Sequence, residues 1–290
     1  MPSSEELVAS LNHDGFVLVP SVLTPPQLAT LRAASARSTG MARSGNWPHL
    51  RTLPKQFPPW PSSPADGIWG VQHVMHPALP DSAIFAESYF SDRILDSVKC
   101  LLDCDDDELI MELYNLLVRP DRDFELRWHR DDIPATATAE EEMDRLAHPA
   151  WHAQWNLALY DDSSLIVVPG SHRRPRTEQE RTAEPYEKDM PGQIAVEMKA
   201  GDVVFYNNNI LHRGVYSKVV ERMTLHGSVG CVKGGSLRAR NVLQHGVGEW
   251  VGELKVDNLP PGMRGRAEKM RARLVELGRE STDVGYSHAD

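Results

Sequence analysis

The chain has 290 residues, of which 41% are hydrophobic and 25% charged, with a formal net charge of −10 and three cysteines. This is the composition of a globular protein, and it excludes a collagen-like chain, a wholly disordered chain and a disulfide framework. The acid excess argues against nucleic acid or an anionic membrane as a partner. Because no signal-peptide pattern and no apolar run of membrane-spanning length is visible, we expect a cytoplasmic protein.

The first part of the chain, about residues 1–108, is predicted to be mainly helical. Helical patterns cover 4–39 in two pieces, separated by a short strand at 15–20, and a further helical pattern covers 81–104. Residues 40–80 are rich in Pro, Gly and Trp and have weak periodicity, which is typical of a binding loop or of a connection that packs on the body of the protein.

The pattern changes to strands after residue 108. An all-β core is predicted over about 109–232, with a helical insertion at 135–147, and a C-terminal helical extension is predicted over about 233–290. Many short strands at this spacing indicate a sandwich or barrel in one domain spanning 1–290. The candidate strands are 110–118, 124–130, 151–160, 165–168, 194–198, 202–206 and 222–231.

Two histidines and one aspartate form the strongest candidate site. His129 and Asp131 are two residues apart at the end of a predicted strand, so their side chains point to the same side of an extended chain. His212 follows about eighty residues later, after a tight turn at Gly201-Asp202 and a buried strand. Two imidazoles and one carboxylate can hold one face of a non-haem Fe(II) ion and leave three positions open. Asp132 is a rival ligand, but on a strand it points away from His129.

Arg222 and Thr224 come ten and twelve residues after His212 and share one face of the next strand. A guanidinium inside a barrel is costly without an anionic partner, and it can grip a carboxylate with two hydrogen bonds while a hydroxyl adds a third. A dicarboxylate cosubstrate would supply such a partner.

These motifs together resemble the phytanoyl-CoA dioxygenase family. They are His129-x-Asp131, the strand and turn 165–172 (LIVVPGSH), the distal His212 and Arg222, and the resemblance covers roughly residues 5–235. Members of that family are Fe(II)- and 2-oxoglutarate-dependent oxygenases on a double-stranded β-helix. The implied fold is therefore an all-β core with flanking helices, a jelly roll of the cupin-like kind.

The resemblance implies a role for each matching residue. His129, Asp131 and His212 would bind Fe(II), and Arg222 with Thr224 would hold the distal carboxylate of 2-oxoglutarate. Trp155 and Asn115 match family positions beside this cosubstrate. With dioxygen, such an enzyme converts 2-oxoglutarate to succinate and oxidises a small-molecule substrate, most often by hydroxylation.

Some features depart from the family or lie outside its motifs. The loop 161–164 (DDSS) is short where many relatives carry Asn-Gly, and we expect it to tighten the turn without touching the metal. Because Asp131 is present, halogenation is disfavoured.

Gln72, His73 and Trp69 are candidate substrate contacts, although simple packing explains them as well. The alternative function is a jelly-roll isomerase, lyase or binding protein without oxygenase activity, and oligomeric state is not readable.

Overall fold

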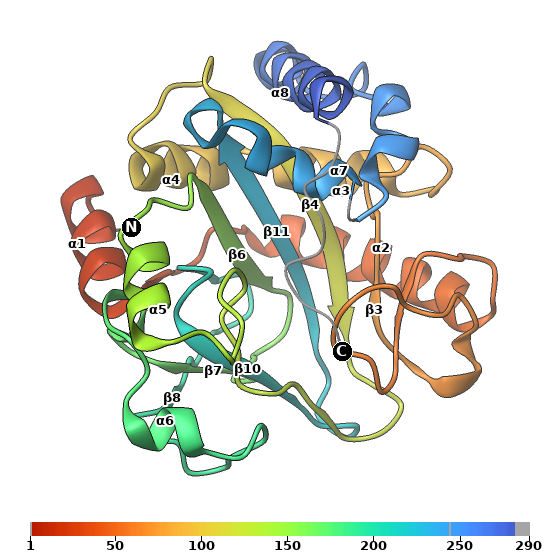
Figure 1. Cartoon of the computed structure of the whole chain (residues 1–290). Coiled ribbons are helices and arrows are strands. Elements are labelled where there is room, and N and C mark those ends of the chain that lie inside the picture. The colour runs from red at the N-terminus through yellow and green to blue at the C-terminus, as the bar shows by residue number, and fades with distance from the viewer. Residues whose placement is uncertain (1, 244, 282–290) are drawn as a thin grey trace.

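Two antiparallel sheets face each other at the centre of the protein. The computed structural model describes residues 2–243 and 245–281. The larger sheet has the strand order β1-β9-β6-β11-β4-β3-β2, and the smaller one has the order β5-β10-β7-β8. Figure 1 shows β6, β11 and β4 side by side, with α5 and α6 on the side of the smaller sheet. This arrangement confirms the predicted fold class, an all-β jelly-roll core with flanking helices.

The strands range in length from two residues in β5 and β8 to ten in β4. They are β1 (Phe16–Val19), β2 (Leu50–Thr52), β3 (Ile68–Val71), β4 (Leu109–Val118), β5 (Phe124–Glu125), β6 (His152–Ala158), β7 (Leu165–Val168), β8 (Ile194–Ala195), β9 (Val203–Tyr206), β10 (Leu211–Tyr216) and β11 (Met223–Cys231).

Helices flank this core in the described residues. They are α1 (Ser4–Asp14), α2 (Pro25–Arg43), α3 (Ser82–Tyr89), α4 (Asp92–Leu102), α5 (Ala139–Leu146), α6 (Glu178–Thr182), α7 (Arg240–Leu243) and α8 (Pro261–Glu280). Short 3₁₀ turns lie at Pro64–Asp66, Ser171–Arg173, Val232–Ala239, Val247–Glu249 and Val251–Glu253. None of the helices in this part of the chain has the length and apolar character that crossing a membrane requires.

The first helix shows how local sequence sets an element's ends. The Ser3 hydroxyl accepts a hydrogen bond from the Glu6 N–H, and the Glu6 carboxylate accepts one from the Ser3 N–H. This capping box starts α1, as the serine before an acidic turn predicts. Gly15 ends the helix with a φ of 84°, a conformation that favours glycine.

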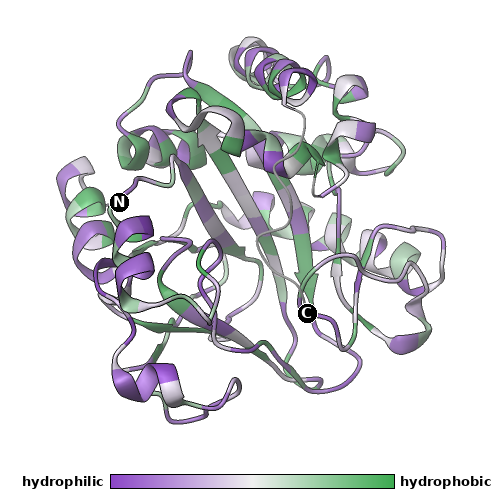
Figure 2. Ribbon diagram, in the orientation of Figure 1, coloured by the Kyte–Doolittle hydropathy of each residue, from purple (hydrophilic) through white to green (hydrophobic). Residues whose placement is uncertain are grey.

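The main hydrophobic core lies between the larger sheet and the helices. On β6, Ala153, Trp155 and Leu157 belong to this core, whereas Gln154 and Asn156 face the other way, toward the smaller sheet. The alternation follows from the pleat of a strand. Figure 2 shows that β4 is largely hydrophobic, whereas α5 and α6 are mostly hydrophilic.

Two strands differ from the expectation for the first part of the chain. The described residues 2–108 contain four helices and the predicted strand β1, which pairs with β9 at one edge of the larger sheet, but β2 and β3 also extend its other edge. The irregular composition of 40–80 concealed β2 and β3 because each has only three or four residues. Part of the predicted extension 233–290, residues 282–290, lies outside the described residues.

A close approach at β11 gives a first test of this packing. A Cβ at Gly227 would lie 2.5 Å from Cζ2 of Trp155 and 2.8 Å from Cδ2 of Tyr114. We expect Gly227→Ala to lower the free energy of unfolding by about 1–3 kcal/mol, because the two rings are packed in the core. Gly252→Ala is the control, since no atom lies within 4 Å of that Cβ. Equal urea-denaturation stabilities for the two variants would contradict this packing.

Candidate metal centre and cosubstrate site

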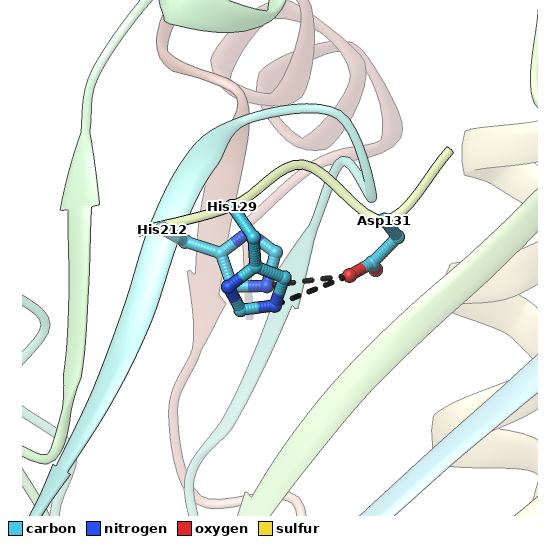
Figure 3. A group of neighbouring side chains, drawn as sticks. All are labelled: His129, Asp131 and His212. Carbon is cyan, nitrogen blue, oxygen red and sulfur yellow. Dashed lines mark ion pairs between the residues drawn. The ribbon is translucent and has the colours of Figure 1, made fainter. Parts of the chain in front are cut away.

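The three predicted metal ligands converge at the open end between the two sheets. Nε2 of His129 lies 3.5 Å from Oδ1 of Asp131, and Nε2 of His212 lies 3.6 Å from the same oxygen. One ligand atom from each residue lies within 4.8 Å of the others, the one such group of His, Cys, Asp and Glu in the described residues. Figure 3 shows both imidazoles turned toward the carboxylate. With metal–ligand bonds of about 2.1 Å, neighbouring octahedral ligands are about 3 Å apart, so this spacing suits one ion.

Backbone carbonyls orient both imidazoles. Nδ1 of His129 lies 2.8 Å from the carbonyl oxygen of Arg127, and Nδ1 of His212 lies 2.8 Å from that of Ile210. Each Nδ1–H donates to the carbonyl two residues earlier, which leaves the lone pair of Nε2 directed at the metal position. Such hydrogen bonds fix the tautomer and raise the basicity of the ligand.

The carboxylate of Asp131 is held from the larger sheet. Nε2 of Gln154 donates a hydrogen bond of 2.9 Å to Oδ2 of Asp131, which leaves Oδ1 facing the two histidines. The rival ligand Asp132 instead pairs with Arg240 and Asn208. The structure therefore brings the predicted set of His129, Asp131 and His212 together and places Asp132 outside it, although β5 ends at Glu125 and these residues do not continue the strand.

The loop around His129 is joined to the start of β10 and the loop before it. The backbones of His129 and His212 exchange two hydrogen bonds of 3.0 Å, and the Asp131 N–H donates to the carbonyl of Asn208. Arg130 is fully buried and donates to the carbonyl of Asn209 at 2.7 Å. Because these contacts link residues 129–132 to 207–212, the ligand positions are set by backbone pairing before any metal binds.

The turn after β7 supports the same region. Gly170 has a φ of 73°, and the Ser171 hydroxyl accepts a hydrogen bond of 2.8 Å from the Leu211 N–H, next to His212. Nε2 of His172 lies 3.2 Å from the carbonyl of Asn12 at the end of α1. The Pro-Gly-Ser-His segment thus anchors the start of β10 to the N-terminal helix, and His172 stabilises the turn rather than joining the metal ligands.

Arg222 and Thr224 share one face, as predicted, but their partner belongs to the chain itself. Nε of Arg222 lies 3.0 Å from Oδ2 of Asp162, the Thr224 hydroxyl donates to the same oxygen at 2.7 Å, and Nη2 of Arg222 donates to Thr224. The expectation that the loop 161–164 only tightens a turn is therefore incomplete. Nη1 of Arg222 is buried without a hydrogen-bond partner in the described structure, so one end of the guanidinium remains available for an anion.

Burial and charge act in opposite directions on Asp162. Burial would raise the pKa of its carboxyl, but the Arg222 guanidinium and hydrogen bonds from Ser164 and Thr224 outweigh it and lower that pKa to about 2. For Arg222, burial lowers the pKa, and Asp162 outweighs this and raises it. Both groups are thus charged at neutral pH, and the pair is a fixed part of the cavity wall.

A cavity of about 190 Å³ opens beside the three ligands and reaches Arg222. Its other charged lining residues are Arg51, Asp132, Arg238 and Arg240. Its polar and aromatic lining includes Gln56, Phe57, Trp60, Trp69, His152, Gln154, Asn156, Tyr206, Asn208, Tyr216, His226, Ser228 and His245. Such a concave site with a few convergent polar groups is typical of small-molecule binding.

The two other predicted cosubstrate contacts do not line this cavity. Trp155 faces the helix layer and packs against Tyr89 and Phe205, because residues alternate along β6 and its neighbours Gln154 and Asn156 take the cavity face. The prediction that Trp155 lies beside the cosubstrate disagrees with this register. Asn115 uses its side-chain oxygen to accept a hydrogen bond from the His73 N–H at 2.9 Å, which fixes a neighbouring loop.

The predicted substrate contacts divide in the same way. Trp69 lines the cavity, but Gln72 and His73 lie outside it. Nε2 of Gln72 donates to the carbonyl of Leu50, and Nδ1 of His73 accepts a hydrogen bond from Nε1 of Trp250. Burial lowers the pKa of His73 to about 3, so this imidazole is neutral and holds the C-terminal segment in place. Packing, the alternative explanation, therefore accounts for Gln72 and His73.

Several cavity residues were not predicted. Leu237, Arg238, Arg240 and His245 come from the C-terminal segment, which folds back over the site. The sequence around these four residues has no pattern that indicates a cavity. Its basic composition also fits a solvated surface. Arg51 and Gln56 come from the 40–80 region, which the aromatic composition had marked as a candidate binding loop.

A comparison with protein-family profiles decides the relationship. The sequence matches the profile described as Phytanoyl-CoA dioxygenase (PhyH) over residues 11–215. The chain belongs to the phytanoyl-CoA dioxygenase family. The matched range includes His129, Asp131, His212 and the LIVVPGSH turn, whereas Arg222 lies beyond it, and the match confirms the family resemblance and the prediction of a dioxygenase-type enzyme. A comparison with curated proteins finds no match.

Solved structures of similar fold support the jelly-roll assignment. AviO1 from Streptomyces viridochromogenes Tue57 has a TM-score of 0.58 at 18% identity, covering 79% of this chain and 96% of that one. EctD from S. alaskensis, solved with 2-oxoglutarate and 5-hydroxyectoine, has a TM-score of 0.57 at 20% identity, covering 81% and 78%. The epimerase SnoN, solved with Fe3+, alpha ketoglutarate and nogalamycin RO, has a TM-score of 0.53 at 20% identity, covering 79% and 84%.

Gln154 gives a test of how this family member orients its carboxylate ligand. We expect Gln154→Leu to weaken Mn(II) binding about 10–100-fold, because Asp131 loses the hydrogen bond that turns Oδ1 toward the histidines. Asn156→Leu is the matched control, since Asn156 lines the same cavity but contacts His226 rather than a ligand. Calorimetric titration measures both. Equal affinities in the two variants would show that Gln154 does not position the ligand.

The Asp162–Arg222 pair predicts a specific pH dependence of stability. The folded-state pKa of Asp162 is lowered from 3.8 to about 2, so its contribution is present above pH 4 and is lost as the pH falls toward 2. We expect Asp162→Asn to destabilise the protein by about 2–4 kcal/mol at pH 7, and we expect that difference to shrink by about 1 kcal/mol between pH 6 and pH 3.

Urea denaturation at several pH values measures this difference, and Asp161→Asn is the control. Asp161 is the exposed neighbour of Asp162 and pairs with Lys199 on the surface, so its replacement should leave stability nearly unchanged. A penalty for Asp162→Asn that stays constant over this pH range would contradict the ion-pair account.

Proposed function

We propose that this protein is an Fe(II)- and 2-oxoglutarate-dependent dioxygenase that hydroxylates a small organic molecule. In that reaction a substrate C–H bond, dioxygen and 2-oxoglutarate give a C–OH product, succinate and carbon dioxide. The observation that carries the proposal is the convergence of His129, Asp131 and His212 beside a cavity that reaches Arg222. Family membership supports the same class of chemistry.

The donor set fits a ferrous ion. Two imidazoles with Nε2 directed at one point and a carboxylate on the same side form a facial triad, which leaves positions open for a bidentate cosubstrate and dioxygen. When bound, the iron and 2-oxoglutarate supply the oxidising power, and the protein positions the target C–H bond. His129, Asp131 and His212 are the proposed ligands.

The Arg222 region fits the distal carboxylate of 2-oxoglutarate. The unpartnered Nη1 of Arg222 supports this role because a buried guanidinium N–H without an acceptor is costly. Thr224 donates to Asp162 and accepts from Arg222, so we propose that it orients the guanidinium rather than touching the cosubstrate first. Asp162 keeps Arg222 charged and fixed, and we assign no cosubstrate contact to Trp155 or Asn115.

The surroundings of the site favour a small molecule as the substrate. Trp60, Trp69, Phe57, Leu117 and Leu126 form apolar walls of this cavity of about 190 Å³. We infer a cytoplasmic enzyme without nucleic-acid partners, because the net charge is −10 and the three cysteines, Cys100, Cys104 and Cys231, are free.

A jelly-roll isomerase, lyase or binding protein is the competing function. SnoN is a non-heme alpha ketoglutarate dependent epimerase, so a related fold carries a reaction other than hydroxylation in that protein. Consumption of 2-oxoglutarate with dioxygen separates an oxygenase from a lyase or a binding module. An oxygen atom incorporated from ¹⁸O₂ into the product separates hydroxylation from epimerisation.

The direct test is succinate formation by the purified protein with Fe(II), 2-oxoglutarate and dioxygen. Slow turnover is expected without substrate, and His129→Ala should abolish it by removing a metal ligand. Arg222→Gln should raise the Kd for 2-oxoglutarate in the Mn(II)-loaded protein at least about tenfold, because a charge-assisted pair is lost.

Arg119→Gln is the control for a general loss of positive charge. Arg119 lies next to Arg222 in the fold but pairs with Glu221 near the surface, so its replacement should leave 2-oxoglutarate binding unchanged. Wild-type protein that forms no succinate and binds no 2-oxoglutarate with the metal present would refute the oxygenase proposal.

A further inference from the structure

Arg51 stands apart from the other arginines that line the cavity. Three of the four are paired with acids of the same chain: Arg222 with Asp162 at 3.0 Å, Arg238 with Glu112 at 2.9 Å, and Arg240 with Asp132. Arg51 has no acidic partner in the described part of the chain, and its Nε, like those of Arg238 and Arg240, is buried without a hydrogen bond. A guanidinium in such a place is stable only if an anion or water completes its hydrogen bonds.

The sequence around Arg51 makes room for its side chain. Arg51 lies on β2 opposite Gly70 of β3, and a Cβ at Gly70 would lie 2.9 Å from Cδ of Arg51. The missing side chain at Gly70 therefore leaves space for the stem of Arg51. The indole rings of Trp60 and Trp69 each lie 5.1 Å from its guanidinium carbon.

A guanidinium beside two indoles still needs hydrogen-bond acceptors for its N–H groups. The face of an aromatic ring attracts a cation. The N–H groups of arginine, however, point outward in the plane of the guanidinium and need oxygen acceptors. Burial lowers the pKa of Arg51 to about 10, while Tyr216, Tyr206 and Asp131 across the cavity act to raise it. Arg51 therefore remains charged at neutral pH.

The wall next to Arg51 is apolar. Leu53, Trp69, Leu117, Leu126 and Tyr216 form one hydrophobic cluster, against which Trp60 packs. A ligand that reaches both this wall and the metal would bury a hydrophobic body and present one anionic group to Arg51. Asp162 already uses part of the hydrogen-bonding capacity of Arg222, whereas Arg51 has no acidic partner in the described residues, so the two guanidinium groups differ in what they still need from a ligand.

We propose that Arg51 binds a carboxylate of the oxidised substrate, so that the substrate class is an apolar molecule with one carboxylate. This inference rests on the proposed function, because the cavity is taken to be the site of oxidation. It assigns Arg51 as a specificity-determining residue in contact with substrate, distinct from the metal ligands and from Arg222.

The experiment uses the full-length protein loaded with Mn(II) and 2-oxoglutarate, which binds ligands without turnover. Benzoate, phenylacetate and cyclohexanecarboxylate are titrated by calorimetry, each beside its primary amide. We expect at least one carboxylate to bind about tenfold or more tightly than its amide. In Arg51→Gln this preference should fall to about one, and Arg51→Lys should retain part of it, because lysine keeps the charge but loses the fork.

Each contrary result has a defined meaning. If the wild-type protein prefers none of the carboxylates, or if Arg51→Gln keeps the preference, the proposal is wrong. The Kd for 2-oxoglutarate should change less than about twofold in Arg51→Gln and should rise in Arg222→Gln. An equal rise in both variants would mean that Arg51 holds the cosubstrate, and the inference about the substrate would then fail.

The proposed function and this inference can fail separately. Wild-type protein that binds no 2-oxoglutarate would refute the oxygenase function, and the carboxylate titrations would then be repeated with Mn(II) alone. Thermal unfolding of both Arg51 variants serves as the folding control. Because Arg51 has no ion pair within the described chain, its replacement should leave the melting temperature nearly unchanged.

Discussion

The pairing of residues 129–132 with residues 207–212 is the constraint on which the site depends. Mutual hydrogen bonds between the backbones of His129 and His212, and the donation from Asp131 to Asn208, place ligands that are about eighty residues apart along the chain at one point. The Ser171 hydroxyl then fixes the start of β10, and Gln154 fixes the carboxylate from the opposite sheet. Because the ligand positions are already ordered, metal binding does not have to include the entropic cost of ordering these segments.

Charge compensation is the second organising feature of the cavity. Asp162, Glu112 and Asp132 each neutralise one buried or half-buried arginine, so that the wall carries charge without a large desolvation penalty. In Glu112, burial would raise the pKa, but Arg238 and His152 outweigh it and lower it to about 2. Against this background the unpaired guanidinium of Arg51 and the free Nη1 of Arg222 indicate where external anions belong.

Periodicity and motif order predicted the jelly-roll class and the grouping of His129, Asp131 and His212. The predicted strand 124–130 is shorter in the structure, where β5 ends at Glu125, so the backbone pairing of His129 with His212 brings the three residues together. Family position alone did not predict which side of β6 Trp155 faces. A shift of one residue along a strand moves a side chain from the cavity side to the helix side. Asp162 was missed as the partner of Arg222 because sixty residues separate them, and β2 with Arg51 was too short for a periodic pattern.

The most direct measurement is a crystal structure of the protein grown anaerobically with Fe(II) and 2-oxoglutarate. The account predicts one iron bound by Nε2 of His129, Nε2 of His212 and a carboxylate oxygen of Asp131, with the far carboxylate of 2-oxoglutarate on Arg222. Iron held through Asp132, iron elsewhere in the protein, or 2-oxoglutarate bound away from Arg222 would contradict it.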